Sequence, residues 1–148
     1  LTDGRYKERK VECDEAKAYF ERQDLCALDR AEIAAAPLRE AACKRALHCA
    51  TEHRRVFATV AALKAGDVEK VGAMMNESHI SMRDNFEMSI EPIDALVADA
   101  TAFGALGARL TGGGFGGCIV ALVENTGKEK WLTRLLDAHP EAWFVCDV

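Results

Sequence analysis

The most constraining feature of this 148-residue chain is a run of glycines near its C-terminal end. Between Gly112 and Gly117, five of the six positions are glycine and Phe115 is the exception. Glycine tolerates positive φ angles and lets a backbone approach a ligand closely. Successive main-chain N–H groups in such a loop form a concavity that suits anionic oxygens. A hairpin connection without a ligand is the alternative, although such a hairpin needs only one or two glycines.

The surroundings of the run exclude two common nucleotide-binding motifs. Gly112, Gly114 and Gly117 satisfy the spacing G-x-G-x-x-G, but that fingerprint opens a helix inside a parallel β-α-β unit. Here the run leads into the apolar segment 118–123 (CIVALV), which is typical of a buried strand. No Gly-Lys-Ser/Thr sequence is present, so the loop is not a P-loop of the Walker kind. The pattern predicts a strand over 105–110, the glycine loop, and a strand over 118–123.

The rest of the chain has mainly helical periodicity, in segments that end at glycine or proline. A charged stretch of irregular period covers residues 81–89, and a connection with a short helical turn covers 25–36. Helices are expected over residues 6–20, 38–65, 67–79, 92–100 and 128–139.

The second half of the chain predicts an α+β fold. A final strand is expected over 142–148 (AWFVCDV), with Trp131 and Trp143 as core anchors. The order helix, strand, loop, strand, helix, strand matches a ferredoxin-like two-layer sandwich with an antiparallel sheet, whose first strand is absent and which carries inserted helices. A sheet without one strand has an exposed edge or a gap. We therefore expect residues 1–148 to be one domain of something larger.

Charge and hydropathy exclude several classes of partner. The formal charge is −5 and no Lys/Arg block is present, so nothing favours a nucleic-acid partner. No apolar span approaches the roughly 18 residues of a transmembrane helix, so no membrane partner is expected. The N-terminus, residues 1–10, is polar and basic, unlike a signal peptide.

The cysteines favour a reducing environment. No C-x-x-C pair is present, and the histidines lack the spacing of a zinc site. Free thiols that pack as small hydrophobes indicate a cytoplasmic protein, with disulfides or metal binding as the alternatives. The six cysteines are Cys13, Cys26, Cys43, Cys49, Cys118 and Cys146.

Three segments resemble one enzyme family. Residues 108–118 (ARLTGGGFGGC) closely resemble the third motif of galactokinases, in the GHMP family of small-molecule kinases. Residues 75–87 (MNESHISMRDNFE) look like the family's segment before that motif, and residues 6–13 (YKERKVEC) are similar to its tyrosine-led helix. The three segments occur in the family's order and cover most of the chain.

The resemblance implies a reaction and a set of site residues. Galactokinases transfer the γ-phosphoryl group of ATP to the anomeric hydroxyl of galactose, with Mg²⁺. The resemblance implies that Tyr6 hydrogen-bonds a sugar hydroxyl, whereas an interfacial aromatic of an amphipathic helix is the alternative. It places a loop at the cleft between two domains, beside the sugar and the nucleotide phosphates: Gly112, Gly113, Gly114, Phe115, Gly116 and Gly117.

The chain also lacks several motifs of the family. Its first motif, its Ser-rich phosphate loop and its catalytic aspartate have no counterpart here. The resemblance therefore implies no catalytic residue and no metal ligand in this chain, with ATP and Mg²⁺ bound mainly by an N-terminal domain. The 148 residues alone are expected to be inactive. Alternatives are a non-catalytic galactose and ATP sensor, a stand-alone ferredoxin-like metabolite-binding module, or another GHMP kinase that acts on an N-acetylated sugar.

Four polar residues have competing interpretations. His79 lies on a methionine-rich helix face and is expected to be a satisfied core histidine. Arg83 and Glu87 are i,i+4 neighbours if the region is helical, which favours a network that holds the loop over a solvated charge cluster. Arg109 lies near the glycine run, where either a phosphate contact or an ion pair explains it.

Overall fold

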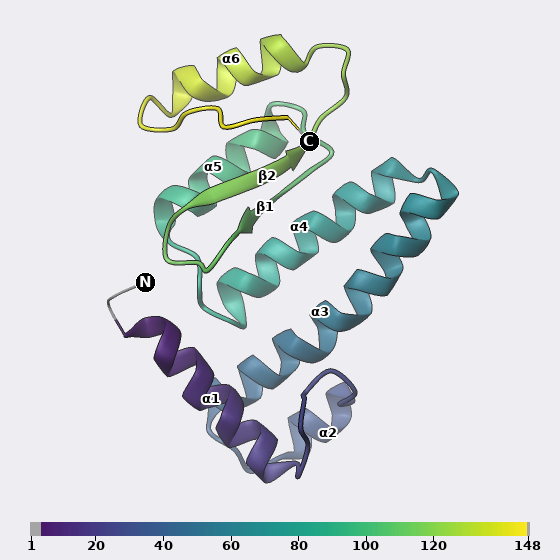
Figure 1. The fold of residues 1–148 in the computed structure, drawn as a ribbon, viewed down its shortest axis with the longest axis vertical. Coiled ribbons are helices and arrows are strands. Elements are labelled where there is room, and N and C mark those ends of the chain that lie inside the picture. Colours follow the sequence, from purple (N-terminus) through teal and green to yellow (C-terminus); the bar gives the residue numbers. More distant parts are fainter. Residues whose placement is uncertain (1–3, 148) are drawn as a thin grey trace.

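The structure is a computed structural model that describes residues 4–147. Its elements are α1 (Arg5–Tyr19), α2 (Arg30–Ala35), α3 (Glu40–Ala65), α4 (Val68–Asp84), α5 (Glu91–Ala102), β1 (Gly107–Thr111), β2 (Cys118–Leu122) and α6 (Lys128–Ala138). Helices α3 and α4 lie side by side (Figure 1). Helices α1 and α2 pack at one end of α3, whereas the two strands, α5 and α6 lie beyond α4.

The helix boundaries follow signals in the sequence. Helix α3 ends at Gly66, whose φ of 72° is the left-handed shape that glycine adopts after a helix. Asp67 caps α4, because its side chain accepts a hydrogen bond of 3.0 Å from the N–H of Lys70. Pro92 lies in the first turn of α5, where its missing N–H has no cost. These three boundaries confirm the expected ones.

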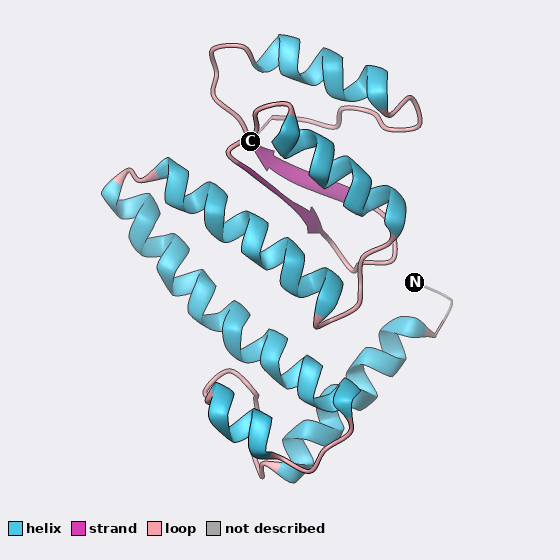
Figure 2. Ribbon diagram, turned by 180° about the vertical axis from the view of Figure 1, so that it is seen from behind, coloured by secondary structure: helices cyan, strands magenta, loops and turns pink. Residues whose placement is uncertain are grey.

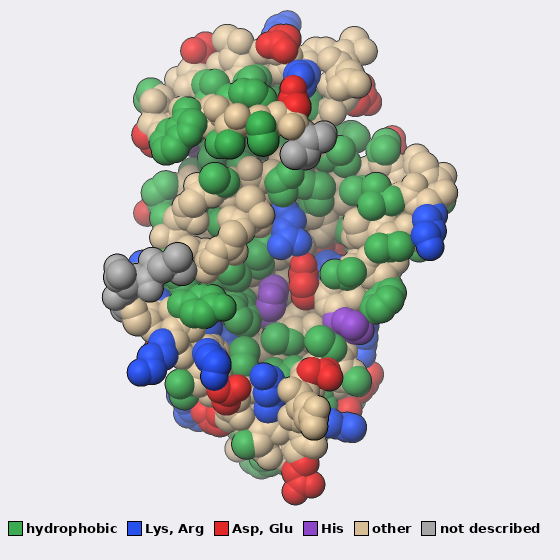
Figure 3. All heavy atoms as spheres, in the orientation of Figure 1, with side chains coloured by type: hydrophobic (Ala, Val, Ile, Leu, Met, Phe, Trp, Pro, Cys, Tyr) green, Lys and Arg blue, Asp and Glu red, His purple; other side chains and the backbone are tan. Residues whose placement is uncertain are grey.

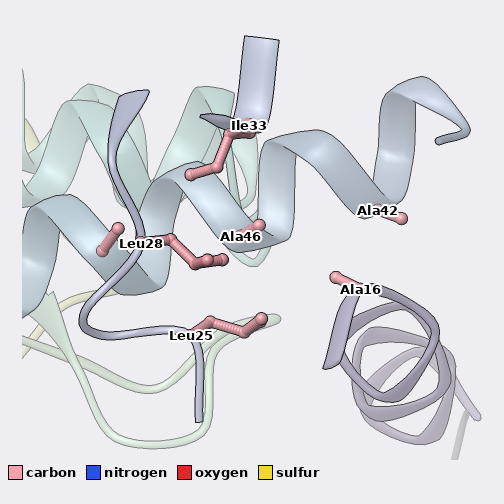
Figure 4. Close-up of a cluster of buried hydrophobic side chains, with 7 residues drawn as sticks. Ala16, Leu25, Leu28, Ile33, Ala42 and Ala46 are labelled. Atoms are coloured by element: carbon pink, nitrogen blue, oxygen red, sulfur yellow. The ribbon is translucent and has the colours of Figure 1, made fainter. Parts of the chain in front are cut away.

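A first hydrophobic core joins α1, α2 and α3 (Figure 4). Small alanines on α1 and α3 let these helices approach closely, and larger aliphatic side chains from the connection fill the remaining space. Burying one such leucine contributes about 2 kcal/mol. The core fixes α1 against α3 and consists of Ala16, Leu25, Leu28, Ile33, Ala42, Ala46 and Ala50.

The two strands form an antiparallel hairpin with Thr111 opposite Cys118. Helix α5 covers one face of this hairpin (Figure 2), and α6 packs beside α5. The indole Nε1 of Trp131 donates a hydrogen bond of 2.9 Å to the carbonyl of Ala100, which confirms Trp131 as an anchor of this region. The buried residues of this second core are Val97, Ala100, Ala108 and Leu135.

Helix α4 closes the outer edge of β1 with side chains. The amide oxygen of Asn76 accepts from the N–H of Ala108 at 2.9 Å, and its nitrogen donates to the carbonyl of Leu106 at 3.3 Å. His79 Nδ1 accepts from the N–H of Leu110 at 3.3 Å. Asn76 and His79 lie three residues apart on one helix face. They therefore take the place of a neighbouring strand along this edge.

Two glycines let α4 and β1 meet through their backbones. A Cβ at Gly72 would lie 2.4 Å from the carbonyl oxygen of Leu106, and a Cβ at Gly107 would lie 2.2 Å from that of Gly72. Neither distance is compatible with a side chain. This contact holds β1 close enough to α4 for the side-chain bonds at its edge to form.

The C-terminal segment differs from the expected strand. Residues 142–147 form no strand, and the sheet of the described chain has two strands; Val148 lies outside the described residues. A strand needs a hydrogen-bonded neighbour, and none is in place for this segment. The expectation that Trp143 is a core anchor is also wrong, because this residue is 78% exposed. The α+β arrangement of helices around an antiparallel hairpin is confirmed.

Helix α4 is longer than the sequence pattern predicts. It continues to Asp84 because Ser81 and Met82 are both buried and extend its inner face. The irregular stretch is therefore confined to residues 85–90, between α4 and α5.

Candidate functional site

The glycine run forms the turn between β1 and β2, and most of it has a backbone shape that favours glycine. The φ angles are 95° at Gly112, 80° at Gly114, 129° at Gly116 and 97° at Gly117. Phe115 also has a positive φ, 60°, which is uncommon for a residue with a side chain. The number of glycines in the run thus corresponds to a backbone that other residues would strain.

The segment between α4 and α5 supports the loop from one side. The N–H of Phe115 donates a hydrogen bond of 2.7 Å to the carbonyl of Met88. Gly114 is in such close contact with the same residue that a Cβ would lie 2.6 Å from the Met88 oxygen. Among the described residues, the other N–H groups between 112 and 117 have no main-chain or side-chain acceptor outside the hairpin. They remain available to an anionic ligand.

The N-terminal turn of α1 lies beside the loop. The guanidinium of Arg5 sits over the ring of Phe115, 4.4 Å from its centroid, a cation–π contact. Tyr6 is the next residue along α1 and is 56% exposed. The structure thus brings the first turn of α1, which carries Tyr6, against the glycine loop.

A buried ion cluster lies behind these two elements and was missed by the sequence reasoning. Glu87 does not pair with Arg83 as expected, because Arg83 binds Asp84 at 2.7 Å. Glu87 instead binds Arg45 of α3 at 2.6 Å. Nothing in the local sequence around Arg45 distinguishes it from the other arginines of α3, so no signal was available to find it.

Arg109 forms an ion pair rather than an open contact with the loop. Its Nη1 lies 3.0 Å from Oε1 of Glu52, which also accepts a bond of 2.6 Å from Ser78. Burial alone would raise the pKa of Glu52, but hydrogen bonds from Ser78 and Arg55 hold the pKa below its usual range. Glu52 is therefore a carboxylate that links α3, α4 and β1.

His79 is buried, as expected, but of its two ring nitrogens Nδ1 has a hydrogen bond and Nε2 does not. Its Nδ1 accepts from the N–H of Leu110, which requires an unprotonated Nδ1. Its Nε2 lies 3.1 Å from Oδ1 of Asp94, without a well-aligned hydrogen bond. Burial lowers the pKa of His79 more than Asp94 raises it, which favours the neutral ring.

Two shallow hollows of the described surface lie away from the glycine loop. One follows α6, and the other lies between α2 and α3. Within residues 4–147, no group of three or more His, Cys, Asp or Glu side chains could hold a metal ion. None of the described helices is both long and apolar enough to cross a membrane.

Comparison with known proteins identifies the family of the chain. The family model of the C-terminal region of GHMP kinases matches residues 59–135, which include the glycine loop. The chain belongs to the GHMP kinase family. This GHMP kinase chain is also similar in structure to a galactokinase from Lactococcus lactis solved with galactose, with a TM-score of 0.87 and 34% identity over 95% of the chain. The mevalonate kinase of L. major, solved with R-mevalonate, matches over 80% of the chain with a TM-score of 0.54 and 25% identity.

Curated relatives of this GHMP kinase chain are galactokinases. That of Glaesserella parasuis is 48% identical over 99% of the chain, and that of Actinobacillus pleuropneumoniae is 46% identical over 92%. A galactokinase of Clostridium perfringens is 36% identical over 96% of the chain. The chain spans 41%, 37% and 39% of the length of these three relatives. The similarity therefore concerns a part of longer enzymes.

Proposed function

We propose that this chain is the C-terminal part of a galactokinase. The longer polypeptide would transfer the γ-phosphoryl group of ATP to the anomeric hydroxyl of galactose, giving galactose 1-phosphate. The observation that carries this proposal is that similarity to galactokinases runs through the whole chain, including both the Tyr6 helix and the glycine loop. The chain alone is inactive, because the family's catalytic aspartate and phosphate loop have no counterpart in it.

The chain's own residues contribute binding and orientation. The free N–H groups of the glycine loop bind anionic oxygens at the phosphate end of the nucleotide, where they oppose developing negative charge. Tyr6 offers a phenol that hydrogen-bonds a hydroxyl of galactose. Phosphoryl transfer depends mainly on such positioning and on electrostatic stabilisation. The two groups would hold the acceptor sugar and the donor phosphate in one place.

Kinases bind Mg²⁺ with one or two carboxylates together with the phosphates of the nucleotide. Within residues 4–147, no group of three or more His, Cys, Asp or Glu side chains could hold a metal ion by itself. We assign Mg²⁺ and most contacts to ATP to the preceding part of the polypeptide. That N-terminal domain is the proposed partner of the open surface beside Tyr6 and the glycine loop.

The thiols support a reducing, cytoplasmic setting for the enzyme. All six cysteines are free, although two of them, Cys13 and Cys49, pack against the same hydrophobic core on α1 and α3. An oxidising compartment would favour cross-linking of such neighbours.

The test is a coupled assay of the longer polypeptide with ATP and galactose. We expect turnover that yields galactose 1-phosphate and that falls at least about 100-fold when Gly112, Gly113 and Gly114 are deleted. Tyr6→Phe should raise the KM for galactose more than it lowers kcat, because it removes one hydroxyl contact. Binding of galactose and ATP without turnover would contradict the kinase proposal and favour a sensor. Turnover of a different sugar, without turnover of galactose, would contradict the assignment of galactose as the substrate.

A further inference from the structure

Arg45 lies at the centre of the buried ion cluster and contacts two separate parts of the chain. Its side chain is 1% exposed. Its Nε donates to Oε2 of Glu12 on α1 at 2.7 Å, and its Nη2 donates to Oε2 of Glu87 at 2.6 Å. Its Nη1 donates to the carbonyl of Asn85. All three nitrogens of one planar group are thus used.

This arrangement fixes directions as well as contacts. A guanidinium presents its N–H donors in a rigid planar fork, so its acceptors are held at set angles to one another. A buried ion pair is weak evidence for stability, because desolvation of the charges offsets much of their attraction. An apolar side chain at position 45 could fill the space, but it would remove the bonds from α3 to both α1 and the segment 85–90 and leave the longer Arg9–Glu87 contact of 3.4 Å.

Glu87 connects the cluster to the support of the glycine loop. Glu87 has a φ of 52°, a left-handed shape that a side-chain residue adopts only when its surroundings enforce it. Met88 follows directly, and its carbonyl accepts the N–H of Phe115 at 2.7 Å. Since Gly114 is in close backbone contact with Met88 as well, a shift of Glu87 moves the support of the loop.

Glu12 connects the cluster to α1, the helix that carries Tyr6. Glu12 and Tyr6 lie on α1, about 9 Å apart along the helix axis. Arg9, between them, binds Glu12 at 2.9 Å and Glu87 at 3.4 Å, which adds a second link between α1 and the loop support. Arg45 therefore sets the position of the Tyr6 helix through Glu12 and the position of the loop support through Glu87.

We propose that Arg45 is a positioning residue that holds the Tyr6 helix and the glycine loop in register with each other. The proposal rests on the proposed function for its kinetic consequence. Arg45 contacts neither sugar nor nucleotide and acts through Glu12, Glu87 and Met88. Its loss would separate the group that binds the sugar from the group that binds the phosphates.

The experiment compares Arg45→Met with Leu135→Ala in the longer polypeptide. Leu135 is buried in the second core, on helix α6, which packs on α5 and not on α1 or the segment 85–90, so its substitution is a control for lost stability. At a temperature where both variants remain folded, Arg45→Met should lower kcat/KM for galactose by about 30-fold, since small misplacements are costly in positioned reactions. Leu135→Ala should stay within about 2-fold of the parent. Equal values for Arg45→Met and the parent would overturn the proposal.

Two further measurements cover the other outcomes. If Arg45→Met does not fold, Glu87→Gln keeps the shape but removes the charge, and it should lower kcat/KM by about 5-fold; no change would overturn the proposal. If the parent lacks galactose kinase activity, the proposed function fails, but amide hydrogen exchange still tests whether Arg45 supports the glycine loop. The N–H of Phe115 should exchange at least about 10-fold faster in Arg45→Met and at the parental rate in Leu135→Ala. Unchanged exchange in Arg45→Met would overturn the positioning role by itself.

Discussion

Gly114 shows how one residue determines the position of the loop. Its φ of 80° strains any side chain, at a cost of about 1–2 kcal/mol, and a Cβ would also lie 2.6 Å from the Met88 oxygen. Gly112 shares the positive φ but has nothing within 4 Å of its Cβ position. We expect Gly114→Ala to lower kcat about 10- to 100-fold in the longer polypeptide, because the loop must move away from Met88.

Gly112→Ala is the matched control for this prediction, because it carries the backbone strain without the collision. It should lower kcat by less than about 5-fold. Steady-state kinetics of both variants, with thermal unfolding to confirm that both are folded, make the measurement. Equal losses in the two variants would contradict the role of the Met88 contact.

His48 predicts a specific dependence of stability on pH. Burial lowers its pKa to about 4, although Glu52 raises it; Arg55 and Arg109 lower it further. Below its ordinary pKa of about 6.5, the unfolded chain binds a proton at this site that the folded chain does not, so stability falls between pH 6.5 and 4 and the loss is complete below 4. The contribution is about 3 kcal/mol.

His48→Asn removes the titrating ring and leaves an amide near Ser81, the hydroxyl that His48 Nδ1 contacts at 3.0 Å. The difference in free energy of unfolding between parent and variant should therefore shrink by about 3 kcal/mol from pH 7 to pH 4. Denaturant unfolding at several pH values measures it. Parallel pH profiles for the two proteins would show that His48 does not carry this dependence.

At the residue scale, the sequence was informative where a residue type has one use. The glycine run predicted a loop with positive φ angles, and Asp67 and Gly66 predicted helix ends. The role of Arg45 could not be predicted, because its partners lie 33 and 42 residues away and no local pattern specifies such pairs. The same distance in sequence explains why Arg83 was wrongly paired with Glu87.

Among the elements, β1 depends on α4 for its outer edge. Asn76→Ala would leave the N–H of Ala108 and the carbonyl of Leu106 without partners in a partly buried place. Unpaired buried groups cost about 1–3 kcal/mol, so we expect a loss of stability in this range. Asn125→Ala is the control, because Asn125 is exposed in the loop before α6. A loss below about 0.5 kcal/mol in Asn76→Ala, measured by denaturant unfolding, would contradict the edge-closing role.

The sequence predicted elements well where their stability is local and failed where it depends on a distant neighbour. Helices were placed within a few residues because apolar spacing and caps lie inside each segment. The strand expected over 142–148 has suitable side chains, but its described part, residues 142–147, has no hydrogen-bonding neighbour. Periodicity identifies a segment that can be a strand, whereas pairing depends on residues elsewhere.

On the scale of the whole molecule, two exposed apolar regions indicate a missing neighbour. Figure 3 shows hydrophobic side chains over α3, where Val56, Phe57, Val60 and Leu63 share one side of the helix. Trp143 and its successors on the C-terminal segment are exposed as well. Contiguous exposed apolar surface is typical of interfaces. The chain spans about 40% of the length of its galactokinase relatives, and under the proposed function we expect the rest of the longer polypeptide to cover these regions.

Contact with the rest of the polypeptide can be tested at the free edge of β2. The N–H groups of Ala108 and Leu110 point to α4, so by the alternation of an antiparallel ladder those of Ile119 and Ala121 point away from β1. We predict that a strand from the preceding part of the polypeptide pairs with this edge and gives residues 142–147 their missing neighbour.

The amides of Ile119 and Ala121 should then exchange at least about 100-fold slower in the longer polypeptide than unprotected amides do. The amide of Val120, which faces β1, is the internal reference and should be protected as well. Fast exchange at Ile119 and Ala121 beside slow exchange at Val120 would show that β2 remains an open edge, and the expected four-stranded sandwich would then be wrong for the whole enzyme.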